Sequence, residues 1–116
     1  YFDKKEKIYI SENGDFIPYE KIEQLENLPT IIGNKSKFYE FYSVLKNTDF
    51  PLDKIEKFHY FNIGRWDIIF KDGKTLKLPN KNLMKVLKDY ILLESNKTFE
   101  KFSIIDYRIN DQLILK

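Results

Sequence analysis

The sequence has no cysteine and only one histidine, and both shortages limit the chemistry open to it. Without cysteine, disulfides, thiol catalysis and thiolate metal sites are all excluded. His59 stands alone in an aromatic run, so a histidine-based triad or a zinc site would lack its other members. We therefore expect His59 to be a packed or surface residue rather than a base or a ligand.

Glycine is also scarce, and the four glycines, at positions 14, 33, 64 and 73, are far apart. They cannot form the glycine-rich loop that cradles a phosphate. Carboxylates are plentiful, but pairs such as Asp106 and Asp111 are expected to form salt bridges or turns. The sequence therefore predicts no catalytic residue, no metal site and no cofactor, and hence a protein that is not an enzyme.

Long apolar runs are missing as well: no run approaches the roughly 18 residues that a membrane-spanning helix needs. The first residues do not resemble a signal peptide, and the chain begins without Met, so we expect a segment cut from a longer protein. The length of 116 residues suits one domain, predicted to cover residues 1–116.

Aromatic residues, by contrast, are abundant, with 10 Phe, 8 Tyr and 1 Trp. They could form a stacking platform for single-stranded nucleic acid. However, the net charge is only +2, and lysines and acids are interleaved rather than gathered in a basic groove. Most of the aromatic side chains are therefore expected to pack in a core, and no nucleic-acid partner is predicted.

The first half of the chain predicts short strands and one helix. Strands are expected at 7–12 and 16–17 around the hairpin signal Asn13-Gly14, and another near 30–32. From 34 to 46 the apolar residues recur at helical spacing. These residues are Phe38, Phe41, Tyr42 and Leu45. Asn34 or Ser36 is predicted to cap this helix, and the segment Asp49-Phe50-Pro51 to end it.

The second half predicts a hairpin, a helix and two further strands. Strands at 55–63, 65–70 and 75–78 are expected, the last two joined by the turn Lys71-Asp72-Gly73-Lys74. A second amphipathic helix is expected between Asn82 and Leu93, and strands at 102–109 and 112–115. This order predicts an α+β fold: a largely antiparallel sheet with both helices packed on one face.

Three ordered motifs resemble the β domain of the bacterial cell-division family FtsQ, called DivIB in Gram-positive organisms. They are the Trp-led hairpin at 65–78, the helix start at 83–87 and Ile104-Ile105-Asp106-Tyr107-Arg108. The segments at 10–18 and 28–33 are similar to the entry hairpin and the L-P-x-(apolar)-x-G element of the family. The chain departs from the pattern at Ile109, where the family commonly has Tyr, and at Pro79, where Gly is usual.

The resemblance implies a non-enzymatic scaffold at the division septum. Its parent would have one helix in the inner membrane and a POTRA domain, both outside this segment, with the β domain in the periplasm or its extracytoplasmic equivalent. The implied partners are FtsB-like and FtsL-like proteins of the divisome.

The resemblance also implies where a partner binds, namely at the last strands, beginning at the motif arginine. Unpaired backbone groups at a sheet edge can accept a guest strand, and Arg108 could hold a partner carboxylate with two hydrogen bonds. The expected partner-binding residues are Arg108, Ile109, Asn110, Asp111, Gln112, Leu113, Ile114 and Leu115.

Other interpretations remain open. Asp106 and Arg108 point to the same face of a strand, so they could simply brace the sheet. A peptidoglycan-binding or cell-wall-processing domain is the main functional alternative, and a POTRA-like chaperone for secreted β-proteins is another.

Overall fold

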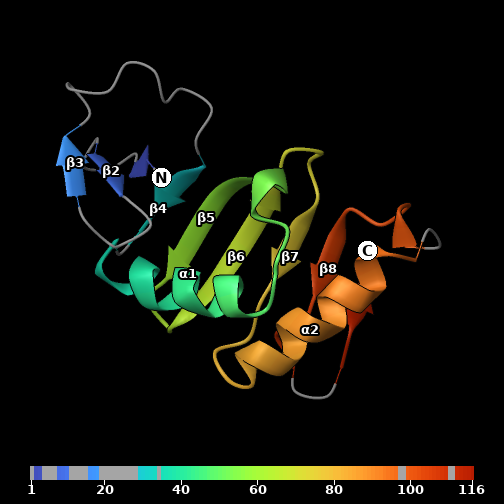
Figure 1. Ribbon diagram of the computed structural model, residues 1–116. Helices are drawn as coiled ribbons and strands as arrows, with labels where there is room; N and C mark the ends of the chain where they lie inside the picture. The colour runs from blue at the N-terminus through green and yellow to red at the C-terminus, as the bar shows by residue number, and fades with distance from the viewer. Residues whose placement is uncertain are drawn as a thin grey trace.

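The computed structural model of the protein describes residues 29–33, 35–96, 99–109 and 112–116 and the backbone of three short strands before them. One sheet runs through the molecule in the order β3-β2-β1-β4-β5-β6-β7-β8-β9 (Figure 1). The first three strands are β1 (Phe2–Asp3), β2 (Ile8–Ile10) and β3 (Phe16–Pro18). The others are β4 (Thr30–Ile32), β5 (Ile55–Phe61), β6 (Arg65–Phe70), β7 (Thr75–Lys77), β8 (Ile104–Asp106) and β9 (Ile114–Leu115).

The predicted α+β class is confirmed, but the sheet is mixed. The neighbours β5–β6, β6–β7 and β8–β9 pair antiparallel, whereas β4–β5 and β7–β8 are parallel. The prediction considered only short hairpin turns, which cannot make a parallel crossover. Here each of the two helices forms part of such a crossover, α1 between β4 and β5 and α2 between β7 and β8.

Both helices lie on one face of the sheet, as predicted (Figure 1). Helix α1 (Phe38–Asn47) follows a 3-10 turn, η2 (Lys35–Lys37), and a second such turn, η3 (Leu52–Lys54), leads into β5. Helix α2 is Leu83–Glu94. The residue at the cap position of α1 is Lys37, so the predicted cap at Ser36 is wrong, and Asn34 lies outside the described residues.

The core lies between these helices and the sheet, and it is aromatic under α1. Phe41 stacks on Trp66 with ring centroids 4.8 Å apart, and Phe38 meets Phe58 edge to face at 4.9 Å. A second cluster under α2 joins Tyr90 to Phe50 and Phe70. The abundant aromatic residues are thus explained first by packing, as the sequence suggested.

The predicted turn at 71–74 is confirmed in detail. Gly73 has φ of +93°, a conformation that glycine adopts at little cost, and the Asp72 carboxylate accepts the backbone N–H of Lys74. The predicted turns at Asn13-Gly14 and Asn110-Asp111 lie outside the described residues.

Candidate functional site

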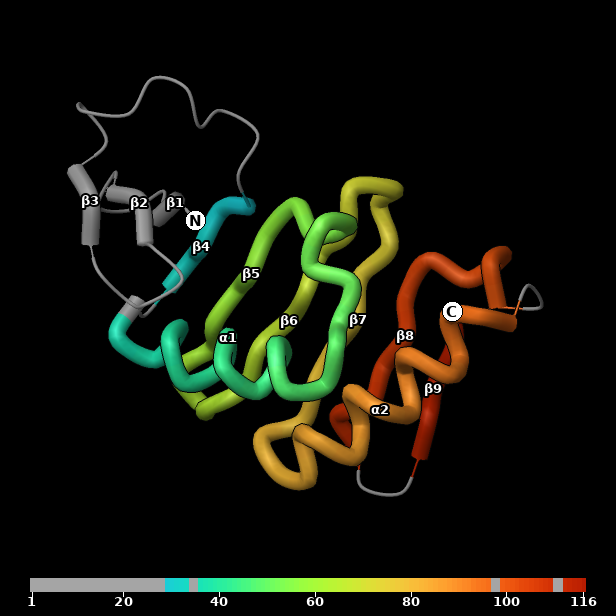
Figure 2. Tube along the Cα trace, viewed as in Figure 1, coloured from blue at the N-terminus to red at the C-terminus, as the bar shows by residue number. Residues whose placement is uncertain are grey.

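Strand β9 closes one end of the sheet. It pairs with β8 alone in the strand order, through Ile105 opposite Leu115 and Asp106 opposite Ile114. Figure 2 shows β9 on the outer side of β8, with α2 in front of both strands. In the part of the chain that the structure describes, the other side of β9 is therefore an edge of the sheet.

The backbone of β9 has a defined orientation at this edge. Ile104 and Lys116 exchange both hydrogen bonds, at 3.2 and 3.0 Å. In an antiparallel pair the bonded residues alternate with residues whose N–H and C=O point away from the partner strand. Leu115, next to Lys116, therefore directs its N–H and C=O toward the edge, where a guest strand would need them.

Arg108 lies at the end of β8 and is held by Asp106. The Nε group of Arg108 donates to both carboxylate oxygens of Asp106, at 2.9 and 3.0 Å, and Nη2 donates to Oδ2 at 2.7 Å. Oδ1 of Asp106 also accepts the backbone N–H of Arg108 at 2.9 Å. This carboxylate thereby fixes both the side chain of Arg108 and the turn of chain that follows β8.

Burial makes the pair strongly asymmetric. Asp106 is 2% exposed, whereas the Arg108 side chain is 41% exposed. The hydrogen bonds from the Arg108 side chain hold the pKa of Asp106 below its ordinary value of 3.8, against the opposing effect of burial. The same pairing raises the pKa of Arg108. Asp106 is therefore a buried anion whose principal counter-charge lies at the surface.

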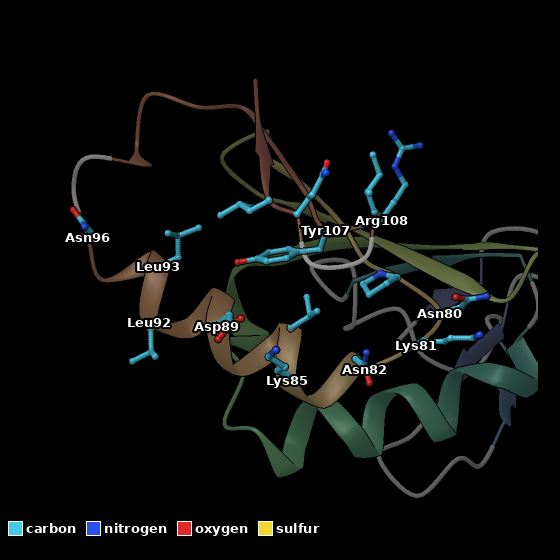
Figure 3. Close-up of a pocket in the computed structure, with 15 residues that line it drawn as sticks. Asn80, Lys81, Asn82, Lys85, Asp89, Leu92, Leu93, Asn96, Tyr107 and Arg108 are labelled. Carbon is cyan, nitrogen blue, oxygen red and sulfur yellow. The ribbon is translucent and has the colours of Figure 1, made fainter.

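The pairing leaves one part of the guanidinium available. Asp106 uses Nε and Nη2, so the end of the group that carries Nη1 is not part of this ion pair. In Figure 3 the Arg108 side chain points away from α2, on the other side of the strand from the Tyr107 ring. The pairing of Asp106 with Arg108 that the sequence left open is present, and the Arg108 side chain is nevertheless 41% exposed.

The remaining predicted partner-binding residues surround the start of β9. Ile109 is 50% exposed and Leu113 is 39% exposed, high values for aliphatic side chains, and Gln112 is exposed. Ile114 and Leu115 are half-buried in β9. Asn110 and Asp111 lie outside the described residues.

The sequence did not predict a groove that opens beside these residues. It has a volume of about 770 Å³ and lies between α2 and the described parts of the connection from β8 to β9, residues 107–109 and 112–113 (Figure 3). Tyr107, Ile109 and Leu113 contribute to one wall, and Val86, Leu92 and other residues of α2 to the opposite wall. Its wall on α2 includes Lys85, Asp89 and Leu92, which share helical spacing but are not part of the apolar pattern that predicted the helix.

Tyr107 is one of the residues that line this groove. It is 9% exposed, and its backbone N–H donates to the Lys77 carbonyl at 2.9 Å. Burial, aided by the negative charge of Asp89, raises the pKa of the Tyr107 hydroxyl to about 12. The hydroxyl therefore stays protonated at physiological pH, which makes it a neutral hydrogen-bonding group between β8 and α2.

His59 lies on β5, far along the sheet from β9. Its ring stacks on Phe61 with centroids 4.3 Å apart, which fits the packed role expected from the sequence. Within the described ranges, His, Asp and Glu form no group of three that could hold a metal ion. No helix among the same residues is long and apolar enough to cross a membrane.

Comparison with known proteins identifies one family. The model described as "Cell division protein FtsQ/DivIB, C-terminal" matches residues 1–108, nearly the whole chain. No curated protein matches the chain. The matched region ends at Arg108, so the residues of β9 fall beyond it.

Proposed function

The chain belongs to the FtsQ/DivIB family of cell-division proteins, and we propose that it acts as a divisome scaffold that docks FtsB-like and FtsL-like partners by strand addition at β9. The family consists of membrane-anchored scaffolds rather than enzymes. In this proposal the parent protein is held in the inner membrane by one helix. The domain faces the periplasm, or the equivalent extracytoplasmic space, at the septum.

The observation that carries this proposal is the orientation of Leu115 at the sheet edge. Its N–H and C=O point away from β8, so a partner strand could pair with them without breaking a bond among the residues that the structure describes. A β-strand that adds to an edge gains affinity from main-chain hydrogen bonds and specificity from side chains nearby.

Arg108 supplies a second contact in the proposal. Asp106 holds one side of the guanidinium, which fixes the direction of the side chain before a partner arrives. The end that carries Nη1 can then donate to a carboxylate of the partner, and this preorganisation lowers the entropy lost on binding. Arg108 is thus the candidate charged contact, and Leu115 the candidate backbone contact.

A proline at position 115 tests strand addition directly. Leu115→Pro removes the outward N–H but leaves the ladder to β8 intact, because the bonds to β8 come from the neighbouring residues. Its matched control, Leu115→Ala, removes the same side chain but keeps the N–H. In a calorimetric titration with the extracytoplasmic segment of an FtsB-type partner, Leu115→Pro should lose at least about tenfold in affinity relative to Leu115→Ala.

Arg108→Glu provides the second arm of the titration. It places a negative charge beside Asp106 and where a partner carboxylate would bind, so binding should be abolished. Thermal unfolding of the variant checks that the domain is still folded at the titration temperature. Unchanged affinity in both Leu115→Pro and Arg108→Glu would overturn the proposed edge. Retention on isolated peptidoglycan in place of partner binding would favour the cell-wall alternative.

A further inference from the structure

Helix α2 carries an exposed stripe along its outer side. Met84, Lys88 and Leu92 follow one another at intervals of four residues, and a helix places residues at that spacing on one side. Met84 is 40% exposed and Leu92 is 73% exposed, and Lys88 is exposed as well. Leu87 and Tyr90, which are buried, form the core face of the helix instead. The stripe is thus directed at solvent rather than at the core.

This stripe differs from the part of α2 that packs inward beside the groove. Val86 and Leu93 are half-buried and pack against the core, so their side chains are already used by the fold. In Figure 3 the Leu92 side chain extends from α2 on the side away from Tyr107. A ligand on the stripe would therefore contact the outer surface of the helix without displacing any core residue.

Lysines accompany the two apolar side chains of the stripe. Lys85 is exposed, and it lines one open hollow on α2 together with Met84 and Lys88. Lys81, which is exposed just before the helix, lines the adjoining surface with Lys85. Asp89 is the acidic residue beside them. The outer face of α2 is therefore cationic overall and contains two well-exposed apolar side chains.

Exposed lysines beside exposed apolar side chains are typical of surfaces that rest on anionic phospholipid. Ammonium groups are attracted to phosphate headgroups within about a Debye length of the membrane. Lysine stems can lie along apolar surface while their ammonium groups stay in water. Methionine and leucine side chains can enter the boundary between headgroups and acyl chains. Each contribution is small, so the resulting contact is weak and reversible.

The stripe suits a lipid surface better than a second copy of this chain. Lys88 is at its centre, between Met84 and Leu92, so a two-fold contact along the stripe would bring two ammonium groups together. A lipid surface, by contrast, is close at hand, because the FtsQ/DivIB family is membrane-anchored. Tethering raises the effective concentration of the surface, so even a weak contact can be occupied.

We propose that the outer face of α2, formed by Lys81, Met84, Lys85, Lys88 and Leu92, rests on the anionic phospholipid surface of the membrane that anchors the parent protein. The lysines bind phosphate headgroups, and the two apolar side chains enter the headgroup boundary. This contact would orient the domain relative to the membrane. The inference goes beyond the proposed function and does not depend on strand addition at β9.

The charged part of the proposal is tested by sedimentation of the chain with lipid vesicles. At low salt the wild-type chain should sediment with phosphatidylglycerol vesicles and much less with phosphatidylcholine vesicles, and added salt should release it. The double variant Lys85→Glu/Lys88→Glu should lose at least about tenfold in binding to phosphatidylglycerol. Its control is Lys71→Glu/Lys101→Glu, which changes the net charge equally at exposed lysines outside α2 and should lose less than about threefold.

The apolar part is tested with a fluorescent label. The chain has no cysteine, so a dye attached to Leu92→Cys reports on that position alone. An environment-sensitive dye at position 92 should shift its emission to the blue on phosphatidylglycerol vesicles, because the side chain enters a less polar boundary. Ile63→Cys is the matched control, since Ile63 is also 73% exposed but lies between β5 and β6. Its emission should not change.

The outcomes are decisive in both directions. Equal sedimentation with the two lipids, equal losses in the two double variants, or equal blue shifts at positions 63 and 92 would each overturn the proposal. Thermal unfolding checks that every variant is folded. If the wild-type chain ignores phosphatidylglycerol while Lys85→Glu/Lys88→Glu weakens the titration with an FtsB-type segment, the face binds a protein and the lipid assignment is wrong. Strand addition is tested separately by Leu115→Pro, so the two failures are distinguishable.

Discussion

The two ends of the described structure differ in how completely their helices are covered. At the α1 end, the apolar stripe of the helix is buried against the long strands β5 and β6. On α2 itself only Leu87 and Tyr90 are buried, the strands β8 and β9 are short, and a groove opens beside the helix. Two helices on the same face of one sheet are thus buried to different extents.

In the proposed function, this difference separates the part of the domain that stabilises the fold from the part that binds a partner. Stacked rings such as Phe41 and Trp66 give the α1 end a rigid core. The α2 end has exposed aliphatic side chains and an edge strand. Such features favour aggregation, and they are also typical of surfaces that bind another protein. We expect substitutions at the α1 end to change mainly the free energy of unfolding, and those at the α2 end mainly the affinity for a partner.

The largest expected effect is at Trp66. Trp66→Ala removes a side chain that is 6% exposed and stacked on Phe41, so the free energy of unfolding should fall by about 4 kcal/mol. The comparison at the α2 end is Leu113→Ala, which should cost less than about 1 kcal/mol because that side chain is 39% exposed. Urea denaturation measures both, and similar losses would erase the difference between the two ends.

A second test uses Gly33, which joins β4 to the α1 crossover. Its φ is +110°, and a Cβ there would lie 2.8 Å from the Tyr60 carbonyl oxygen. Gly64 has φ of +93° with open space around its Cβ position, so Gly64→Ala measures the cost of the backbone conformation alone. We expect Gly33→Ala to cost about 3 kcal/mol and Gly64→Ala about 1 kcal/mol. Equal losses would mean that the close approach to Tyr60 contributes nothing.

A substitution at Asp106 tests whether a residue at the α2 end also contributes to the stability of the fold. Asp106→Asn removes the buried charge that holds Arg108, and the domain should lose about 2 kcal/mol of stability at pH 7. Since the folded pKa of Asp106 is lowered, its contribution is fully present above the ordinary value of 3.8 and is lost as the pH falls through the lower folded value. Acid unfolding of the variant should accordingly depend less on pH than that of wild type. An unchanged acid profile would contradict this role.

The smallest change in the free energy of unfolding is expected at an ion pair that links the two ends of the structure. Lys54, just before β5, forms an ion pair with Glu94 at the end of α2, and this pairing raises the pKa of Lys54. The Lys54 side chain is 60% exposed, so water and salt screen the pair. Glu94→Gln should reduce the free energy of unfolding by less than about 0.5 kcal/mol. A loss of 2 kcal/mol or more would mean that the two ends depend on each other more than the packing indicates.

The sequence predicted the helices and most of the strands, because their apolar spacing is a local property. Phe38, Phe41, Tyr42 and Leu45 are all buried, as their spacing required. Strand β8 is shorter than the expected range of 102–109; it ends at Asp106, whose carboxylate accepts the backbone N–H of Arg108. That hydrogen bond depends on the conformation of the Asp106 side chain, which the spacing of apolar residues in the sequence does not predict.

The candidate site was predicted only in part for a similar reason. The resemblance indicated the chain from Arg108 to Leu115, and the structure brings most of this segment together at the edge of the sheet. The groove was missed because Leu92 and Leu93 were taken as the end of an ordinary amphipathic helix. Only the placement of α2 beside Leu113, which follows from the parallel crossover, shows that its second face lines a concavity.

The central claim is that β9 offers its outer backbone to a partner strand, and amide hydrogen exchange tests it residue by residue. In the free domain, the N–H of Lys116, which donates to Ile104, should exchange slowly and that of Leu115 quickly. On addition of the extracytoplasmic segment of an FtsB-type partner, exchange at Leu115 should slow by at least about tenfold, while Lys116 changes little. A saturating partner that leaves the Leu115 amide exchanging at its free rate would contradict docking at this edge.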